Sequence, residues 1–410
     1  MTVAAQDVTP DLAPSSGYET RWHALTDAGD HSGAIELTQA WIADSKIRDA
    51  DNPWGTFKPL TRLAAAYTAS GEDRLAMNSY REAIALGSVH LGAFSPELIE
   101  PLIELSALLS ANDLQDEALS ALLRAKGITH RNQGIYNSEQ ERIVDSMSDI
   151  YLELDDVQQA TLEQRLLYSM EARQVGEDSP DFVPAIQKWA QFLARIERYR
   201  DARQFLRRAV EILENAYGPN DVRIVDSLNL IADSFRSNEE SKLPPEGRKA
   251  LQRAVSIYRA QDNVDHADLM QAQQALGDWY MTIGSQKRAL ETYREAISVA
   301  QEAGVNQDTI DAQFARPKRL GINDRIVETA RRRMQQNKDA SLLDVEGTVV
   351  FEFDVDQYGL PRNIHVIKNT IDRRTVVAIL RSKVRLLVYR PRYKNGVAVP
   401  TKGVRREYIF

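Results

Sequence analysis

The chain has 410 residues, a formal net charge of −8, 43% hydrophobic residues and no cysteine. The length exceeds what one compact core usually holds and fits two units or one elongated array. The lack of cysteine excludes disulfides, thiolate metal sites and a cysteine nucleophile, and the charged fraction of 27% excludes a bundle of hydrophobic membrane helices.

Residues 1–17 read as a flexible polar leader. They lack the basic and apolar regions of a secretory signal. No segment of the sequence approaches the about 20 consecutive apolar residues that cross a bilayer. A start methionine placed where an export signal had been removed would give the same N-terminus, so export stays open.

Residues 18–302 carry a repeat with a period of 42 residues. Small anchor residues recur at that interval, and one interval of 45 residues precedes the sixth anchor. The three extra residues fit a loop at 242–246, because Pro244-Pro245 cannot continue a helix. A fixed period between about 20 and 50 residues is typical of repeat arrays. The anchors are Ala34, Ala76, Ala118, Ala160, Ala202, Gly247 and Ala289.

The residues around each anchor follow one helical-hairpin pattern. Its clearest copy runs Ala275-Leu276-Gly277-Asp278-Trp279-Tyr280 and continues with Gly284, Ala289, Tyr293 and Ala296. Two helices cross closely only where side chains are small, so a small anchor followed four residues later by a bulky residue makes a hole beside a knob. The pattern resembles tetratricopeptide repeats of the kinesin-light-chain style. The resemblance implies an α-solenoid of about seven hairpins, the first of them degenerate and capping.

A solenoid exposes a long concave surface, which favours a binding role over a purely structural one. First-helix positions that face inward in the tetratricopeptide family are polar here in four successive repeats. We predict that they form a peptide-binding groove; a merely solvated face would also be polar, so both interpretations stay open. The residues are Asp145, Asp149, Gln187, Gln191, Asn229, Asp233, Gln274 and Asp278.

Beyond residue 302 the helical period stops and the charge reverses. Residues 312–410 hold 21 Lys/Arg and 10 Asp/Glu, a balance of +11, whereas the rest of the chain holds 30 and 49, a balance of −19. An acidic array joined to a basic module indicates two domains with different partners. We expect a linker at 303–322 and a C-terminal domain at 323–410, which is small and of the α+β class.

The C-terminal domain switches to strand spacing after one helix. The expected elements are a helix at about 324–336, a strand at 347–356, a turn at 357–359, a returning strand at 360–368, an amphipathic helix at 372–387 that Tyr389-Arg390-Pro391 ends, a turn at 395–396 and a final strand at 402–410.

This order of elements, with its spaced glycines and aromatics, resembles the C-terminal domain of TonB. The family's Tyr-Pro motif ahead of its first helix has no clear counterpart, and Arg316-Pro317 is the nearest. The residues that carry the resemblance are Gly347, Val349, Phe351, Phe353, Val355, Asp356, Gly359, Tyr389, Arg390, Pro391, Gly396 and Phe410.

The resemblance implies a periplasmic βαβ module that binds a short extended segment of an outer-membrane transporter by strand addition. An edge strand offers unpaired backbone N–H and C=O groups to such a segment. The alternation of this strand is poor because its charges crowd together, so the charges may be read instead as gatekeepers that keep an edge soluble. The expected edge residues are Val404, Arg405, Arg406, Glu407, Tyr408 and Ile409.

No enzyme signature stands out. The six histidines form no ligand-spaced pair, and the sequence contains no P-loop, GxGxxG or GxSxG motif. The segment Asp354-x-Asp356-x-x-Gly359 has His365 where a calcium loop needs its glutamate, so it predicts a hairpin turn. We expect no catalytic residue, no metal and no cofactor. Nucleic acid is not expected either, because no strand interleaves aromatic and basic residues in the RNA-binding pattern.

We therefore expect a non-enzymatic periplasmic adaptor whose export signal or anchor is absent from this chain. Its repeats would bind proteins or peptides, and its TonB-like domain would bind a TonB-dependent transporter. The alternative is a soluble envelope scaffold that has lost energy coupling and whose C-terminal domain binds the repeat array, another protein or peptidoglycan. An intracellular regulatory scaffold is disfavoured only by the TonB resemblance. The oligomeric state is not predicted.

Overall fold

The computed structural model describes residues 16–48, 53–134, 138–237, 243–322 and 346–409. By its internal contacts the chain divides into two compact units, Met1–Gln174 and Val175–Phe410. The first unit holds the earlier repeats. The second holds the later repeats together with the C-terminal domain, so the expected division near residue 302 is not where the contacts separate.

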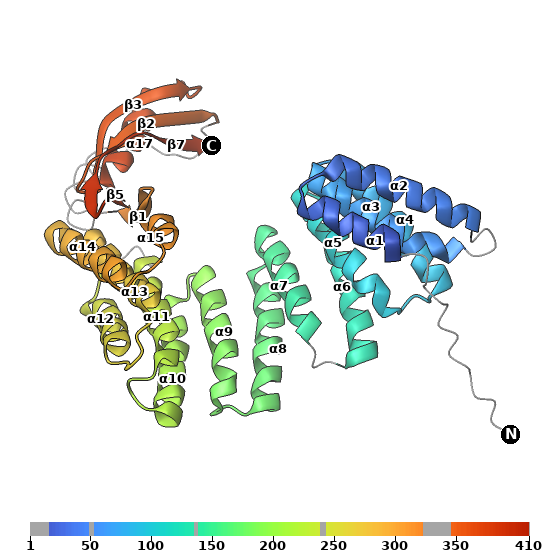
Figure 1. The fold of residues 1–410 in the computed structure, drawn as a ribbon, viewed down its shortest axis with the longest axis horizontal. Coiled ribbons are helices and arrows are strands. Elements are labelled where there is room, and N and C mark those ends of the chain that lie inside the picture. The colour runs from blue at the N-terminus through green and yellow to red at the C-terminus, as the bar shows by residue number, and fades with distance from the viewer. Residues whose placement is uncertain (1–15, 49–52, 135–137, 238–242, 323–345, 410) are drawn as a thin grey trace. The chain divides into compact units, whose positions relative to one another are not determined.

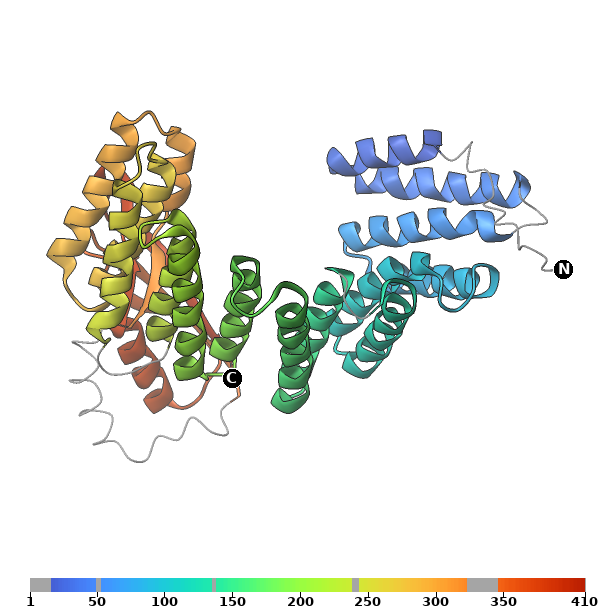
Figure 2. The ribbon, with the colours of Figure 1, turned by 90° about the horizontal axis from the view of Figure 1, so that it is seen from below.

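The first unit is a stack of helices that pack in sequence order (Figure 2). Short 3-10 turns at Pro53–Thr56 and Pro96–Leu98 lead into two of them. The helices are α1 (Ser16–Asp27), α2 (His31–Arg48), α3 (Phe57–Ser70), α4 (Asp73–His90), α5 (Ile99–Ala111), α6 (Gln115–Gln133), α7 (Ser138–Glu153) and α8 (Val157–Val175).

The second unit holds a helical stack of its own, together with the C-terminal domain (Figure 1). With α1 to α8, the helices up to α14 make seven successive hairpins in the described residues, as the repeat predicts. The helices of this unit are α9 (Val183–Arg195), α10 (Tyr199–Tyr217), α11 (Val225–Ser237), α12 (Pro245–Arg259), α13 (His266–Thr282), α14 (Gln286–Glu302) and α15 (Gln307–Phe314).

The anchor residues lie where helices cross, as predicted. The alanine anchors are completely buried. A Cβ added to Gly247 would lie 2.2 Å from Trp279 Cη2, so this crossing accepts only glycine without rearrangement. The small anchors therefore set how closely the two helices of a hairpin approach.

The turn inside four successive hairpins also repeats. Gly71, Asp113, Asp155 and Glu197 lie 42 residues apart and all have positive φ, with values of 78°, 59°, 59° and 62°. A left-handed residue after a helix lets the last carbonyls find backbone donors. Non-glycine residues accept this conformation at a cost of about 1 kcal/mol, so the turn geometry is imposed by the packing of the hairpin.

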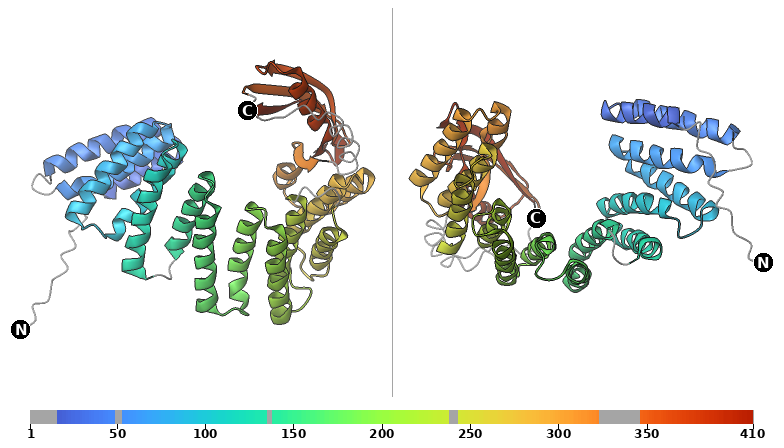
Figure 3. Two further views of the ribbon diagram at one scale, coloured as in Figure 1. Left: turned by 180° about the vertical axis from the view of Figure 1, so that it is seen from behind. Right: turned by 60° about the horizontal axis from the view of Figure 1, so that its bottom comes forward.

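The C-terminal domain is an antiparallel three-stranded sheet of order β3-β2-β7 with helix α17 packed on one face (Figures 1 and 3). Alternate residues of β2 are buried against α17, and they include Phe351 and Phe353. The predicted hairpin, helix and final strand are therefore all present. The elements are β2 (Thr348–Val355), β3 (Pro361–Asn369), α17 (Arg374–Leu386), β4 (Leu387–Arg390), β5 (Arg392–Lys394), β6 (Val397–Val399) and β7 (Thr401–Ile409).

Two expectations differ from the structure. The expected linker 303–322 contains helix α15 and strand β1 (Lys318–Ile322), and β1 pairs antiparallel with β4. Helix α17 passes directly into β4, so Tyr389 and Arg390 lie in a strand rather than at a helix end. The expected helix at 324–336 lies outside the described residues.

Candidate functional site

The predicted groove residues occupy two turns of successive first helices. The position nearer the C-terminal end of each helix is here called the inner repeat position. It is filled by Asp149 on α7, Gln191 on α9, Asp233 on α11 and Asp278 on α13, at intervals of 42, 42 and 45 residues. The other predicted residues lie one helical turn earlier on the same helices.

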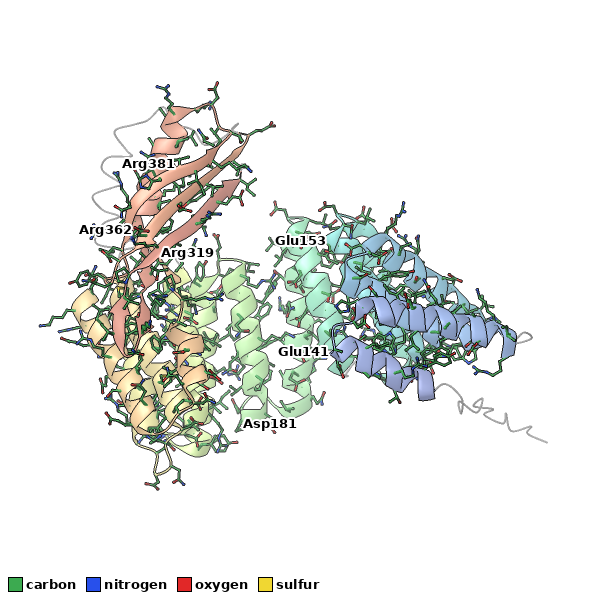
Figure 4. All side chains as sticks on the ribbon, turned by 45° about the horizontal axis from the view of Figure 1, so that its top comes forward. Glu141, Glu153, Asp181, Arg319, Arg362 and Arg381 are labelled. Atoms are coloured by element: carbon green, nitrogen blue, oxygen red, sulfur yellow. The ribbon has the colours of Figure 1, made fainter. Side chains whose placement is uncertain are left out.

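In the first unit both predicted residues lie on α7. Asp149 is exposed, and Asp145 is half-buried and accepts a hydrogen bond from Gln164 Nε2 at 2.8 Å. Figure 4 labels two further carboxylates of the same helix, Glu141 and Glu153. The spacing of four residues places successive members of this series near one face of α7, so the helix presents an acidic surface.

In the second unit the α9 and α11 residues stay accessible. Gln191 and Asp233 are exposed, and Asp233 forms an ion pair with Arg236 of the same helix. Gln187 is half-buried and donates a hydrogen bond to Ser227 Oγ at 2.9 Å, and Asn229 is also half-buried. These four residues could meet a partner.

On α13 the groove prediction is wrong. Asp278 is only 4% exposed and Gln274 only 8%. Arg390 of β4 binds Asp278 with two hydrogen bonds, from Nε to Oδ1 and from Nη2 to Oδ2, both of 2.9 Å. The carboxylate that we expected in an open groove is therefore held by the chain itself. The reason is that β1 and β4 pack against α13.

Arg390 is buried as fully as its partner, with 1% exposure. Its Nη1 donates to the carbonyl oxygen of Gln313 at 2.5 Å, and its guanidinium lies 5.5 Å from the ring centre of Phe314. A buried guanidinium needs a carboxylate and further acceptors to offset its lost hydration. Residues at the end of α15 supply that second acceptor, so three parts of the chain meet at one charge pair.

Three aromatic rings enclose the pair. Tyr293 of α14, Phe314 of α15 and Tyr393 of β5 have ring centres 5.6 to 5.9 Å apart. The hydroxyl of Tyr293 donates to Asp278 Oδ1 at 2.7 Å. Burial raises the pKa of Tyr293 well above 10.0, and the charge of Asp278 and this hydrogen bond raise it further. The tyrosine therefore stays a neutral donor to the carboxylate.

Sequence reasoning did not assign Arg390, Gln313, Phe314 and Tyr393 to this site. Arg390 served only as part of a family motif, and Tyr293 only as the knob of the last repeat. One general signal did point here, because the acidic array and the basic module suggested that the two parts contact each other. No local sequence pattern could predict the pair of Asp278 and Arg390, since the two residues are 112 positions apart.

Strand β7 lies at one edge of the three-stranded sheet, as predicted. Although its charges are crowded in the sequence, the burial of its side chains alternates from Val404 to Ile409. Val404, Arg406 and Tyr408 are half-buried, and Arg405, Glu407 and Ile409 are exposed. Arg406 turns inward because its guanidinium lies over the Tyr408 ring, 5.3 Å from its centre. The crowded charges are thus divided between two faces of the strand.

The two edges of the sheet differ in regularity. The pairing of β7 with β2 runs without a shift from Thr348↔Ile409 to Phe353↔Val404 and shifts once beyond it, near Gly403, which has a φ of 69°. The pairing of β3 with β2 shifts at two places, and Asn363 in β3 has a φ of 51°. Bulges and kinks make an edge a poor template for another strand. Of the two edges, β7 is therefore the better strand acceptor.

The segment that resembles a calcium loop is a hairpin turn, as predicted. Asp356 Oδ1 accepts hydrogen bonds from the backbone N–H groups of Tyr358 and Leu360, both at 2.9 Å, and its Oδ2 accepts one from Arg362 Nε. Within the described ranges, no three His, Asp or Glu side chains are grouped so that they could hold a metal ion. Nor does any described helix have the length and apolar character to span a membrane.

Basic side chains of the second unit come from several elements. Figure 4 labels Arg319 on β1, Arg362 on β3 and Arg381 on α17. Burial raises the pKa of Tyr389, and the positive charges of Arg406 and Arg319 partly oppose that rise. The charge excess that the sequence predicts for the C-terminal region is thus spread over it.

Residues 190–222 match the model of a tetratricopeptide repeat family. The match runs from α9 through α10 to the turn before α11, so it covers parts of successive hairpins. This match and the hairpins described above indicate tetratricopeptide-like helical repeats. Repeats of this type generally bind proteins or peptides.

Similar proteins come from distant sources. The RxLR effector protein SFI4 of Phytophthora infestans is 23% identical over 132 residues, which span 32% of this chain and 38% of that protein. A putative kinesin light chain repeat structure from Podosopora anserina is 17% identical, with a TM-score of 0.43, and covers 50% of this chain and 96% of its own. A tetratricopeptide repeat protein from Parabacteroides merdae is 16% identical, with a TM-score of 0.39 and coverages of 72% and 96%. These likenesses are too low to carry a functional argument.

Proposed function

We propose that this chain is a non-enzymatic adaptor of the periplasm that holds partner proteins on its repeats and takes up an extended transporter segment on its C-terminal domain. The observation that carries the proposal is the edge position of β7, whose residues from Val404 to Ile409 pair with β2 without a shift. The order β2, β3, α17 and β7 supports the resemblance to the C-terminal domain of TonB. A segment that adds to β7 gains affinity from backbone hydrogen bonds with little demand on its sequence.

The repeats contribute the second contact of the adaptor. Gln191 and Asp233 in the second unit, and Asp149 in the first, offer accessible polar groups at one repeat position. Amide and carboxylate side chains suit the backbone and the basic groups of a peptide. The partner of this surface is therefore a polar peptide segment rather than an amphipathic helix, which would need an apolar groove.

Strand addition can be tested by titrating the full chain with a labelled peptide from the N-terminal region of a TonB-dependent transporter, followed by fluorescence anisotropy. The matched control is the same peptide with alternate backbone amides N-methylated, because methylation removes the donors that a β-ladder needs. We expect saturable binding of the first peptide and none of the second. Equal binding of both, or binding of neither, contradicts strand addition at β7.

The second candidate is an envelope scaffold whose C-terminal domain no longer couples energy and serves as a partner of the repeats. The buried pair of Asp278 and Arg390 favours it, because this pair fixes the domain on the last repeat. This candidate predicts that neither transporter peptide binds, while the full chain still binds another envelope component such as peptidoglycan. Sedimentation with purified peptidoglycan, at low and high salt, separates the two candidates.

A further inference from the structure

The side chain at the inner repeat position is exposed in some repeats and buried in another. Asp149, Gln191 and Asp233 occupy it with exposed side chains, whereas Asp278 occupies it with a buried one. The residue type does not explain the difference, because three of the four are aspartates. What differs is that β1 and β4 cover α13.

The residue that covers Asp278 belongs to an extended strand, and a bound peptide would also be extended. Arg390 is the last residue of the extended strand β4. Successive residues of a strand point to opposite sides, and Leu387 and Tyr389 join the core of the C-terminal domain. Arg390 therefore points the other way, toward the last repeat, where its two nitrogens meet the two oxygens of Asp278.

The site that Arg390 occupies fits a guanidinium group better than an ammonium group. A planar guanidinium matches a carboxylate with two parallel hydrogen bonds, whereas lysine offers a single point charge. The Gln313 carbonyl takes a third N–H of the same group at 2.5 Å, and the Phe314 ring lies beside it. Lysine at this place has one nitrogen, so it could not repeat the two parallel hydrogen bonds that Nε and Nη2 make to Asp278.

We propose that strand β4 is an intramolecular ligand of the last repeat: Arg390 closes the inner repeat position of α13 to outside partners, and an extended, arginine-bearing segment is the partner chemistry that can take its place. Because β4 is part of the same chain, its effective concentration at α13 is of the order of millimolar or higher. The free chain is therefore closed at this repeat, and the accessible positions of α9 and α11 are the ones open to a partner.

The proposal is tested on the full chain with Arg390→Ala and with a labelled peptide of residues 387–392, Leu-Val-Tyr-Arg-Pro-Arg, which contains β4. Hydrogen exchange reports on α13 and β4, and anisotropy reports on peptide binding. We expect amide exchange in α13 and β4 to be at least about tenfold faster in Arg390→Ala than in the wild type. We also expect the peptide to bind the variant at least about tenfold more tightly than it binds the wild type, and a lysine-for-arginine peptide to bind about tenfold more weakly.

The matched control is Arg385→Ala, an exposed arginine of α17 that should leave exchange and binding unchanged. If Arg390→Ala loses its helical circular dichroism, Arg390→Lys replaces it, since lysine keeps the charge and gives up the paired hydrogen bonds. Unchanged α13 exchange in the folded variant overturns the closure. Equal binding of the arginine and lysine peptides overturns the assigned chemistry. Neither readout uses the β7 edge, so failure here is distinct from failure of strand addition.

Discussion

Asp233 on α11 and Asp278 on α13 are the same residue at the same position of adjacent repeats, and each is paired with an arginine. Arg236, the partner of Asp233, lies three residues away on one helix, and the Asp233 side chain is 52% exposed. Arg390, the partner of Asp278, is 112 residues away, and both side chains are almost fully buried. The difference teaches that a repeat position acquires its role from what packs over it. Water reaches the carboxylate of the first pair, while the second pair is buried and joins two parts of the fold.

Replacing each aspartate by alanine tests most directly whether the buried pair contributes more stability than the other. Asp278→Ala leaves the charge of Arg390 buried without its partner, so we expect a loss of about 3 to 5 kcal/mol of stability. Asp233→Ala removes a pair in which the carboxylate is 52% exposed and the arginine 22% exposed, so we expect a smaller loss, of about 1 kcal/mol. Urea unfolding followed by tryptophan fluorescence measures both. Similar midpoints for the two variants would show that the buried pair does not join the domain to the repeat.

The Gly359→Ala variant tests whether the close contact between Gly359 and Tyr389 holds β4 in place. A Cβ on Gly359 would lie 2.0 Å from the carbonyl oxygen of Tyr389, and Gly359 has a φ of 77°. The N–H of Tyr389 also donates to the carbonyl oxygen of Gly359 at 2.9 Å. We expect a loss of at least about 2 kcal/mol from the clash and the backbone strain together.

The control for this variant is Gly396→Ala in the turn between β5 and β6. Its φ is 71°, but a Cβ there meets no atom within 4 Å. Backbone strain alone should cost about 1 kcal/mol. If the two glycine variants unfold at the same urea concentration, then close contact at Gly359 does not position β4.

Tyr293→Phe sharpens the comparison, because the Tyr293 hydroxyl donates to Asp278 in addition to the donors of Arg390. Losing the donor to Asp278 should cost about 1 kcal/mol. The folded-state pKa of Tyr293 lies well above 10.0. A raised folded pKa means that its contribution is complete below the unfolded pKa, about 10, and is lost as pH rises above it.

Wild-type stability should therefore fall above pH 10 by up to about 1.4 kcal/mol per pH unit for this group. Tyr293→Phe should fall less steeply over the same range. The remaining slope has other sources, since burial also raises the pKa of Tyr258 to about 12. Urea midpoints measured between neutral and alkaline pH check this, and parallel curves for the two proteins contradict the assignment.

Arg405→Ala should give the smallest effect. Arg405 forms an ion pair with Glu352 at 3.0 Å, and the arginine side chain is 69% exposed. Exposed pairs contribute less than about 1 kcal/mol. The midpoint should hardly move, in contrast to the buried arginine of β4. A shift as large as that of Asp278→Ala would mean that exposure does not separate the two kinds of pair.

Much of the fold could be predicted because its causes are local. The 42-residue spacing of small anchors gave the seven hairpins, since helix crossings need small side chains wherever they occur. Alternation from 347 to 356 gave strand β2, and the segment from Asp354 to Gly359 gave the turn. The edge position of β7 followed from family resemblance. The ordered segment 303–322 was missed because β1 has little strand pattern of its own and forms only by pairing with β4.

The sequence by itself determined the repeat, its number of hairpins, the hairpin, helix and final strand after residue 347 and the opposite charges of the two regions. These follow from periodicity and composition along the chain. Only the tertiary structure decided which polar positions stay open. Gln191 and Asp233 remain accessible, whereas Asp278 is buried under a strand more than a hundred residues further along the chain. Burial depends on which distant segments pack together, and no local spacing contains that information.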